Sequence, residues 1–159
     1  MWSFLLAGGI LALDQITKAI VMASMSQNQS ITVLGNLFRI TYIHNPGAAF
    51  GLHIAPSTFH AVFNAVASIV ISYFLVTLPK KEYWPRIALA LVLAGALGNL
   101  VDRLRIGEVI DFIQVGLSDR LIWPIFNVAD MGVSTGVVLL MLFFLVVGDT
   151  EESGGEIIA

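Results

Sequence analysis

The sequence predicts an all-α membrane protein with four transmembrane helices and a small β-sheet, outside the membrane core, inserted between helices one and two. Hydrophobic residues make up 57% of the 159 residues and charged residues only 12%, about half the charged share of a soluble domain. The mean hydropathy is +0.88. Four apolar segments also approach the ~20 residues that a helix needs to cross a bilayer.

The predicted spans cover residues 2–24, 58–78, 84–104 and 122–147. The first has no basic stretch before its apolar run and contains Asp14 and Lys18. Because a cleavable signal peptide has the opposite features, we expect this span to be retained. Small residues recur every four positions in the third and fourth spans: Ala90, Ala94, Gly98, Gly132 and Gly136. This spacing favours close packing of helix backbones, although small residues are also ordinary in apolar helices.

The connections between the spans differ in composition. Residues 30–54 are rich in β-branched and aromatic side chains and are interrupted by Gly35-Asn36 and by Asn45-Pro46-Gly47, which predicts a small sheet with tight turns. The connection between spans two and three, "PKKEYWPR", is short and polar, with aromatic residues suited to a membrane interface. The tail over 148–159 is expected to be disordered. No internal repeat and no second domain are evident, so residues 1–159 form a single integral membrane domain.

Composition excludes several classes of function. The chain has 8 Lys and Arg residues against 11 Asp and Glu residues, with no basic run, so nucleic acid is not an expected partner. It has no cysteine, which excludes disulfides, thiolate metal sites and a cysteine nucleophile. His44, His53 and His60 do not form a metal-ligand motif, and no G-x-S-x-G elbow occurs. We therefore expect neither a metal nor another cofactor.

The distribution of basic residues does not decide the orientation in the membrane. The connection between spans two and three carries Lys80, Lys81 and Arg86, which favours a cytoplasmic position for it. Four arginines would then lie near the other side: Arg39, Arg103, Arg105 and Arg120.

Charged residues inside the spans are candidate functional residues, because a charge at the bilayer centre costs at least ~2.5 to 3.5 kcal/mol. Asp14 and Lys18 are four residues apart on one helix face, so they form either an ion pair or the wall of a site. Asn99, Asp102 and Arg103 share the end of span three. We expect Asp102 to orient Arg103, and Arg103 and Asn99 to hold a substrate.

Asp111 and Asp130 differ from these residues because neither has a basic residue at helical spacing. If span three ends near Gly107 and span four begins near Ile122, both aspartates lie near the same membrane face. Two carboxylates held close together cannot both ionise easily, so one keeps its proton while the other acts as a base. This is the chemistry of aspartic proteases. Proton relays and hydrogen bonds between helices use the same residue type and remain alternatives.

Five ordered motifs resemble those of the bacterial lipoprotein signal peptidase family, also called signal peptidase II. They are "LDQITK" (13–18), "HNPGAAFG" (44–51), "GALGNLVDRL" (95–104), "VIDFI" (109–113) and "FNVAD" (126–130). The resemblance covers about residues 10–147. It implies a membrane aspartyl endopeptidase with a small extracytoplasmic sheet, which removes the signal peptide of prolipoproteins just before a diacylglyceryl-modified cysteine.

The resemblance also implies roles for particular residues. Asp111 and Asp130 match the catalytic pair. Six other residues match positions that bind the substrate or support the pair: Asn45, Asn99, Arg103, Asn127, Asp14 and Lys18. Both termini are expected in the cytoplasm and the active site near the outer face of the bacterial cell (inner) membrane. The expected partners are diacylglyceryl-modified prolipoproteins, membrane lipid and globomycin-type inhibitors.

Two positions depart from the family pattern. Pro46 follows the loop asparagine, and Met131 follows Asp130 where a small hydroxyl residue is common. The first affects the stiffness of the loop and the second affects packing beside the acid pair, but neither removes a catalytic group. Two other functions are weighed against the peptidase: a proton or ion transporter that uses the intramembrane carboxylates, and a non-catalytic membrane scaffold. No inverted repeat supports a transporter.

Overall fold

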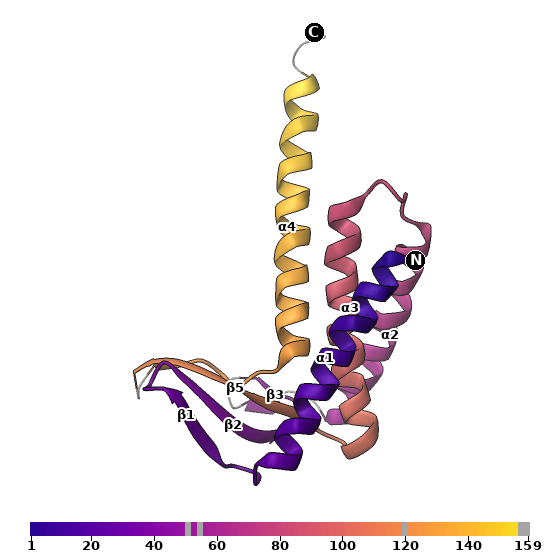
Figure 1. Ribbon diagram of the computed structural model, residues 1–159. Helices are drawn as coiled ribbons and strands as arrows, with labels where there is room; N and C mark the ends of the chain where they lie inside the picture. Colours follow the sequence, from indigo (N-terminus) through magenta and orange to yellow (C-terminus); the bar gives the residue numbers. More distant parts are fainter. Residues whose placement is uncertain (50–51, 54–55, 119–120, 156–159) are drawn as a thin grey trace.

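The computed structural model describes residues 1–49, 52–53, 56–118 and 121–155. Its helices are α1 (Trp2–Ser24), α2 (Ser57–Thr77), α3 (Tyr83–Ile106) and α4 (Val128–Gly155). Within the described ranges, four segments are long and apolar enough to cross a membrane, with residues 128–146 as the fourth. The helices run side by side, and a sheet lies across one end of them (Figure 1). The predicted fold class is therefore confirmed.

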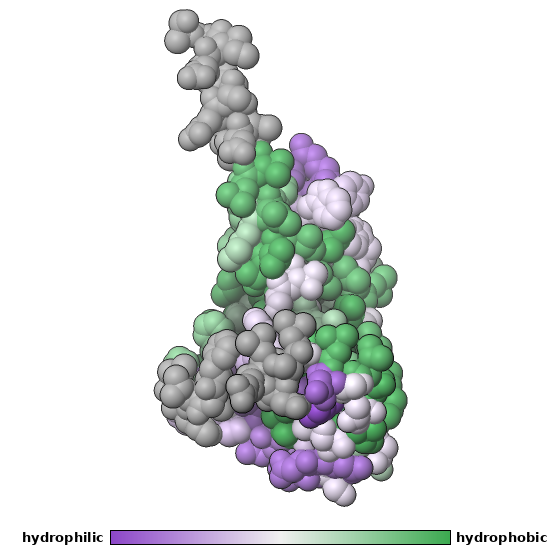
Figure 2. Space-filling view, turned by 90° about the vertical axis from the view of Figure 1, so that its left-hand side faces the viewer, coloured by the Kyte–Doolittle hydropathy of each residue, from purple (hydrophilic) through white to green (hydrophobic). Residues whose placement is uncertain are grey.

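Helix α3 is the centre of the bundle, because it packs against α1, α2 and α4. Half of its most apolar window is buried, against 11% to 22% in the other three helices. A buried cluster of Ala7, Leu75, Ala90, Leu93 and Ala94 joins α1, α2 and α3. The outer helix surfaces stay apolar, and Figure 2 shows this apolar belt between hydrophilic ends. Such a surface is suited to lipid rather than to water.

The small residues predicted to favour close packing lie where α4 crosses α3. A Cβ atom added to Gly136 would lie 2.6 Å from the backbone oxygen of Ala88, and one added to Gly132 would lie 3.1 Å from that of Leu91. On α3, a Cβ atom added to Gly98 would lie 2.6 Å from Oδ2 of Asp14. The absence of side chains at Gly132 and Gly136 therefore lets the α3 and α4 backbones approach, as in other membrane helix pairs, and at Gly98 it leaves room for the Asp14 carboxylate.

The sheet contains strands from two connections, not one. Strands β1 (Ser30–Leu34) and β2 (Phe38–Asn45) precede α2, as predicted, whereas β5 (Val109–Ser118) and β6 (Leu121–Ile122) lie between α3 and α4. The order is β1-β2-β5-β6, with antiparallel pairs. Strands β3 (Ala48–Ala49) and β4 (Leu52–His53) form a separate hairpin. The predicted sheet region 30–54 also includes residues 50–51 and 54, which lie outside the described residues.

The beginning of β5 follows directly from the end of α3. Gly107 adopts the left-handed conformation (φ 79°), and its N–H donates to the Arg103 carbonyl, so the helix ends there. The following residues, "VIDFIQV", are mostly β-branched or aromatic and therefore suited to a strand. Asp111 consequently lies on a strand, fixed by its neighbours in a ladder.

Two predicted boundaries in the last part of the chain were wrong. Helix α4 begins at Val128 rather than at 122, because Leu121–Ile122 pair with β5 and Pro124 follows them. The helix also continues to Gly155, over residues 148–155 that were expected to be disordered. Glutamate at 151 and 152 is a good helix former, which favours this extension. Residues 156–159, also predicted to be disordered, lie outside the described residues.

The two ends of the bundle differ in chemistry. Met1, the α2–α3 connection and the last turns of α4 lie at the end opposite the sheet (Figure 1). At that end the rings of Trp2 and Tyr83 stack with centroids 6.3 Å apart, and Arg86, buried, donates to Oγ of Ser3 and to the Leu78 carbonyl. The candidate acids lie at the sheet end instead.

Candidate active site

Asp130 is positioned by the first turn of α4. Asn127 caps this helix: its Oδ1 accepts the N–H of Asp130 (2.9 Å), and Oδ2 of Asp130 accepts the N–H of Asn127 (3.2 Å). This reciprocal pair is a capping box, which fixes both side chains at the helix terminus. The partial positive charge of the helix N-terminus also stabilises a carboxylate there.

Asp111 is positioned by strand pairing. It faces Ile43 in the β2–β5 ladder, and its side chain is 1% exposed. Its Oδ2 accepts the Asn45 amide (2.8 Å), and its Oδ1 accepts the Asn127 amide (2.6 Å). Asn45 is itself held in a turn, because its Oδ1 accepts the N–H of Gly47, whose φ is 110°. The turn predicted at Asn45-Pro46-Gly47 therefore brings an amide to the acid.

The two acids share one bridging residue. Asn127, which is fully buried, donates to Asp111 and accepts the Asp130 N–H. Asn99 donates to Oδ1 of Asp130 (2.8 Å) and accepts the Asn127 amide at its own Oδ1 (3.2 Å). The structure thus brings together Asp111, Asp130, Asn45, Asn99 and Asn127, which come from β5, α4, β2, α3 and the α4 cap.

Burial and the neighbouring acid change the protonation of Asp111. Desolvation by burial, followed by the negative charge of Asp130, raises the pKa of Asp111 from its ordinary value of 3.8 to about 7. Hydrogen bonds from Asn45 and Asn127, and the charge of Lys18, act in the opposite direction. An acid with this pKa holds its proton part of the time at neutral pH, which is a property of acid–base sites.

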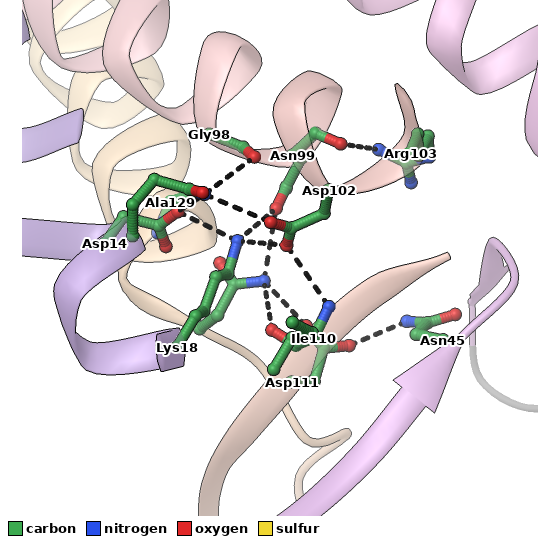
Figure 3. Close-up of polar contacts among 12 residues, drawn as sticks. Asp14, Lys18, Asn45, Gly98, Asn99, Asp102, Arg103, Ile110, Asp111 and Ala129 are labelled. Atoms are coloured by element: carbon green, nitrogen blue, oxygen red, sulfur yellow. Dashed lines mark hydrogen bonds and ion pairs between the residues drawn. The ribbon is translucent and has the colours of Figure 1, made fainter. Parts of the chain in front are cut away.

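A buried ionic cluster lies behind the acids. Nζ of Lys18 is 2.8 Å from Oδ2 of Asp14 and 2.7 Å from Oδ2 of Asp102, and all three side chains are at most 2% exposed. The expectation that Asp102 orients Arg103 is therefore wrong, because Asp102 points toward α1 and pairs with Lys18 (Figure 3). Asp14 and Lys18 form the ion pair that was one of their two predicted roles, and both side chains are buried.

Arg103 lies on α3, apart from Lys18 and its carboxylate partners (Figure 3). Its Nη1 donates to the Asn99 carbonyl (3.3 Å), and its charge interacts with Asp130, Asp111 and Asp102. Its Nε is buried and has no hydrogen-bond partner among the described residues. The guanidinium therefore keeps a donor available beside the acid pair.

Sequence reasoning missed two further contacts of this site. Nε2 of Gln15 lies within hydrogen-bond distance of Asp14, Asp102 and the Gly98 carbonyl, linking α1 to α3. On the sheet, Tyr42, His44 and Glu108 form a chain, with His44 2.7 Å from the tyrosine oxygen and 3.0 Å from the glutamate. The position of Gln15 next to Asp14 gave a signal for the first contact. The second depends on strand pairing that was not predicted.

Taken together, the fold and the site define a multi-pass membrane protein with a pair of acids, one buried and one half-buried, at one end of its bundle. The family model described as signal peptidase (SPase) II matches residues 6–146. The chain belongs to the signal peptidase II family, and the resemblance seen in its motifs is thereby confirmed.

Curated relatives agree with this assignment. The chain is 46% identical over 141 residues to the lipoprotein signal peptidase of Syntrophus aciditrophicus, covering 86% of this chain and 87% of the relative. It is 43% identical over 136 residues to that of Moorella thermoacetica, with the same coverage of 86% and 87%, and 44% identical over 137 residues to that of Pseudomonas aeruginosa, covering 84% and 81%.

Solved structures agree at the level of the fold. Two structures described as a bacterial membrane enzyme, at 2.3 and 1.9 Å resolution, match with TM-scores of 0.81 and 0.80. Both are 34% identical in sequence to this chain and cover 90% of it, and the chain covers 87% and 92% of them.

Proposed function

We propose that this protein removes signal peptides from prolipoproteins by aspartic-type hydrolysis, with Asp111 and Asp130 as the catalytic acids. The chain is a peptidase by family, and its relatives are named lipoprotein signal peptidase. The observation that carries the choice of acids is the bridge made by Asn127, which hydrogen-bonds to both. Its side-chain amide donates to the Asp111 carboxylate and its backbone N–H donates to the Asp130 carboxylate, so one residue holds both carboxyl groups in one site.

The two acids have different surroundings, which supports different roles. Asp130 accepts two N–H donors, from Asn99 and from the Asn127 backbone, at a helix N-terminus that favours negative charge. Asp111, with its pKa of about 7, can carry a proton at neutral pH. In the proposed reaction Asp130 takes a proton from a water molecule, and the resulting hydroxide attacks the peptide carbonyl carbon. Asp111 gives its proton to the carbonyl oxygen.

The second half of the reaction returns both protons. As the tetrahedral intermediate collapses, its carbonyl re-forms and the C–N bond breaks. The proton held by Asp130 passes to the leaving nitrogen, and Asp111 takes a proton back from the intermediate's hydroxyl group. One water molecule is consumed, a carboxyl and an amino terminus form, and the acids end in their starting states.

The polar residues around the acids divide into two groups in this proposal. Arg103, with its unpaired Nε, and Asn45, on the turn beside Asp111, contact the substrate backbone. Asn99 and Asn127 hold the acids. Asn45 also donates to Asp111, but unlike Asn99 and Asn127 it is only half-buried, so in this proposal it can contact the substrate as well.

The proposed substrate carries a diacylglyceryl-modified cysteine, and cleavage occurs just before it. An acylated cysteine and an apolar signal helix leave a bilayer only at high cost, so a site at the membrane boundary suits them. The acids lie at the sheet end of a bundle whose helices can each cross a membrane, and Lys80 and Lys81 lie at the other end. We place the lysine end and both termini in the cytoplasm and the acids near the outer face of the cell (inner) membrane. A globomycin-type inhibitor is expected to compete for this site.

The transporter alternative is not favoured. A proton relay needs ionisable groups spaced along a path through the membrane. The hydrogen bonds and ion pairs of Asp14, Lys18, Asp102, Asp111 and Asp130 instead join them into one cluster at the sheet end.

The experiment that tests this function measures cleavage of a diacylated lipobox peptide by purified protein in lipid. Asp111→Asn and Asp130→Asn should each lower the rate per folded molecule by about 10²- to 10⁴-fold, because asparagine keeps the shape but not the acid–base function. The double variant should be no slower than the worse single variant, since the acids act as a unit.

Glu82→Gln is the matched control, since it removes a carboxylate at the opposite end of the bundle. It should leave the rate unchanged. If the folded wild type gives no product, the proposed function is wrong. If Asp111→Asn cleaves at the wild-type rate, the assignment of the acid pair is wrong.

A further inference from the structure

Lys18 contacts neither catalytic acid, but its neighbours connect it to both. Its ammonium has three acceptors: Oδ2 of Asp14, Oδ2 of Asp102 and Oδ1 of Asn99, at 2.8, 2.7 and 3.2 Å. An ammonium group has three N–H donors, so all of them are used. The side chain is 2% exposed, which leaves no surface for a substrate. Any effect of Lys18 on the reaction must therefore pass through its neighbours.

The first connection runs through the Asn99 amide. Its Oδ1 receives Nζ of Lys18 and Nδ2 of Asn127, so its Nδ2 is left to donate to Asp130, at 2.8 Å. The reversed amide would place NH₂ against an ammonium and oxygen against a carboxylate, and both contacts are repulsive. The lysine thus fixes which end of Asn99 faces Asp130.

The second connection runs through Asp102. Its Oδ2 accepts both Nζ of Lys18 (2.7 Å) and the backbone N–H of Ile110 (3.2 Å). Ile110 immediately precedes Asp111 in β5. The carboxylate is thus fixed between helix α1 and the strand, and through it the lysine fixes the backbone that carries Asp111 (Figure 3).

We propose that Lys18 is a positioning residue for the acid pair, holding Asp130 through the Asn99 amide and Asp111 through Asp102 and the Ile110 backbone. The inference rests on the proposed function, since it assumes that Asp111 and Asp130 perform the hydrolysis. It assigns Lys18 a role different from substrate binding, which its motif had implied. One buried cation sets the geometry of two acids on different elements.

The lysine also contributes an electrostatic effect. Its positive charge lowers the pKa of Asp111, against the larger effects of burial and Asp130. The other charged groups around Lys18 and the acid pair are Asp14 on α1, Asp102 and Arg103 on α3, and Asp130 on α4. Removal of the Lys18 charge makes the surroundings of the acids more negative, so the acids should hold their protons to higher pH.

The test compares Lys18→Met with the wild type in the peptide cleavage assay. At each protein's own pH optimum, kcat per folded molecule should fall about 100-fold, as expected when reacting groups are displaced by about 1 Å. KM should not change, because Lys18 does not touch the substrate. The acid limb of the pH–rate profile should move to higher pH.

Arg86→Met is the matched control. It removes another buried cation, 4% exposed, from the far end of the bundle, where its neighbours are Ser3 and the Leu78 carbonyl. It should lower the thermal stability but change neither kcat per folded molecule nor the pH profile. A buried cation with a purely structural role would behave in this way at position 18 too.

A second variant guards against the failure of Lys18→Met to fold. Asp14→Asn with Lys18→Met removes the cation together with one of its carboxylates, so fewer buried charges are left unpaired. The same loss of kcat and the same shift of the acid limb are expected. If either folded variant keeps the wild-type kcat and pH profile, the positioning role is overturned while the proposed function stands. If the wild type itself does not cleave, the proposed function has failed instead.

Discussion

At the scale of single residues, the cost of buried charge predicted which side chains matter but not how they pair. Asp111 and Asp130 stood out because no basic residue lay at helical spacing from them, and the structure links both to Asn127. Asp102 was assigned to Arg103 because the two are adjacent. Successive residues on a helix point in different directions, so Asp102 reaches Lys18 on α1 instead. Contacts between elements of this kind depend on packing that a single sequence does not reveal.

The raised pKa of Asp111 leads to a prediction about stability. Its pKa in the folded protein is about 7, against an ordinary value of 3.8, so the folded state binds this proton more tightly than the unfolded state does. The stabilisation is complete below about pH 4 and is lost as the pH rises toward about 7, by roughly 4 kcal/mol at most. Thermal unfolding in detergent between these pH values should show wild-type stability falling with pH.

Asp111→Asn should reduce this pH dependence, because asparagine does not titrate. Glu82→Gln should retain it. The opposite result would be a wild type that becomes more stable between about pH 4 and about pH 7, with Asp111→Asn abolishing that gain. It would contradict the direction of the pKa change.

At the scale of elements, long apolar periodicity predicted the helices well, whereas the strand that carries Asp111 was missed. The first three helices begin and end within two residues of the predicted spans. Strand β5 was not predicted because its ladder partner, β2, lies more than 60 residues earlier in the chain. Its composition was suitable, since Val109, Ile110 and Phe112 favour strands, but the pairing that stabilises it is tertiary.

Two glycines with different surroundings should respond to alanine substitution with opposite signs. A Cβ atom at Gly136 would lie 2.6 Å from both the Ala88 carbonyl oxygen and Cγ2 of Val92. Gly136→Ala should therefore destabilise the protein by about 1 to 3 kcal/mol through overpacking. Gly9→Ala on α1 meets nothing within 4 Å, and should be neutral or stabilising by up to about 1 kcal/mol, since alanine is the better helix former.

Thermal unfolding of the two glycine variants in the same detergent measures the difference. Equal melting temperatures would show that α3 and α4 are not packed as closely as the Gly136 geometry requires.

At the scale of the whole molecule, the two ends of the bundle carry different groups. The sheet lies at one end, and the α2–α3 connection and N-terminus lie at the other (Figure 1). Asp111 is on strand β5, Asp130 is in the first turn of α4 and Arg103 is in the last turn of α3, all at the sheet end. Basic residues occur near both ends, so counting them did not orient the chain. The structure distinguishes these basic residues by their surroundings. Arg103 interacts with the acid pair, whereas Lys80 and Lys81 lie in the loop that connects α2 and α3. The positive-inside rule is therefore best applied to the loop lysines.

This separation predicts how the chain is oriented in a cell. The sequence has no cysteine, so single cysteines introduced at Ser26 and Lys81 can be labelled without background. Ser26 follows α1 at the sheet end, and Lys81 lies between α2 and α3; both are exposed. An impermeant maleimide should label Ser26→Cys on spheroplasts with an intact cytoplasmic membrane. It should label Lys81→Cys only after that membrane is permeabilised. Labelling of both from one side would refute the four-span arrangement. If the two sides were exchanged, the spans would stand, but the acids would face the cytoplasm, where the proposed cleavage site of an exported prolipoprotein would not reach them.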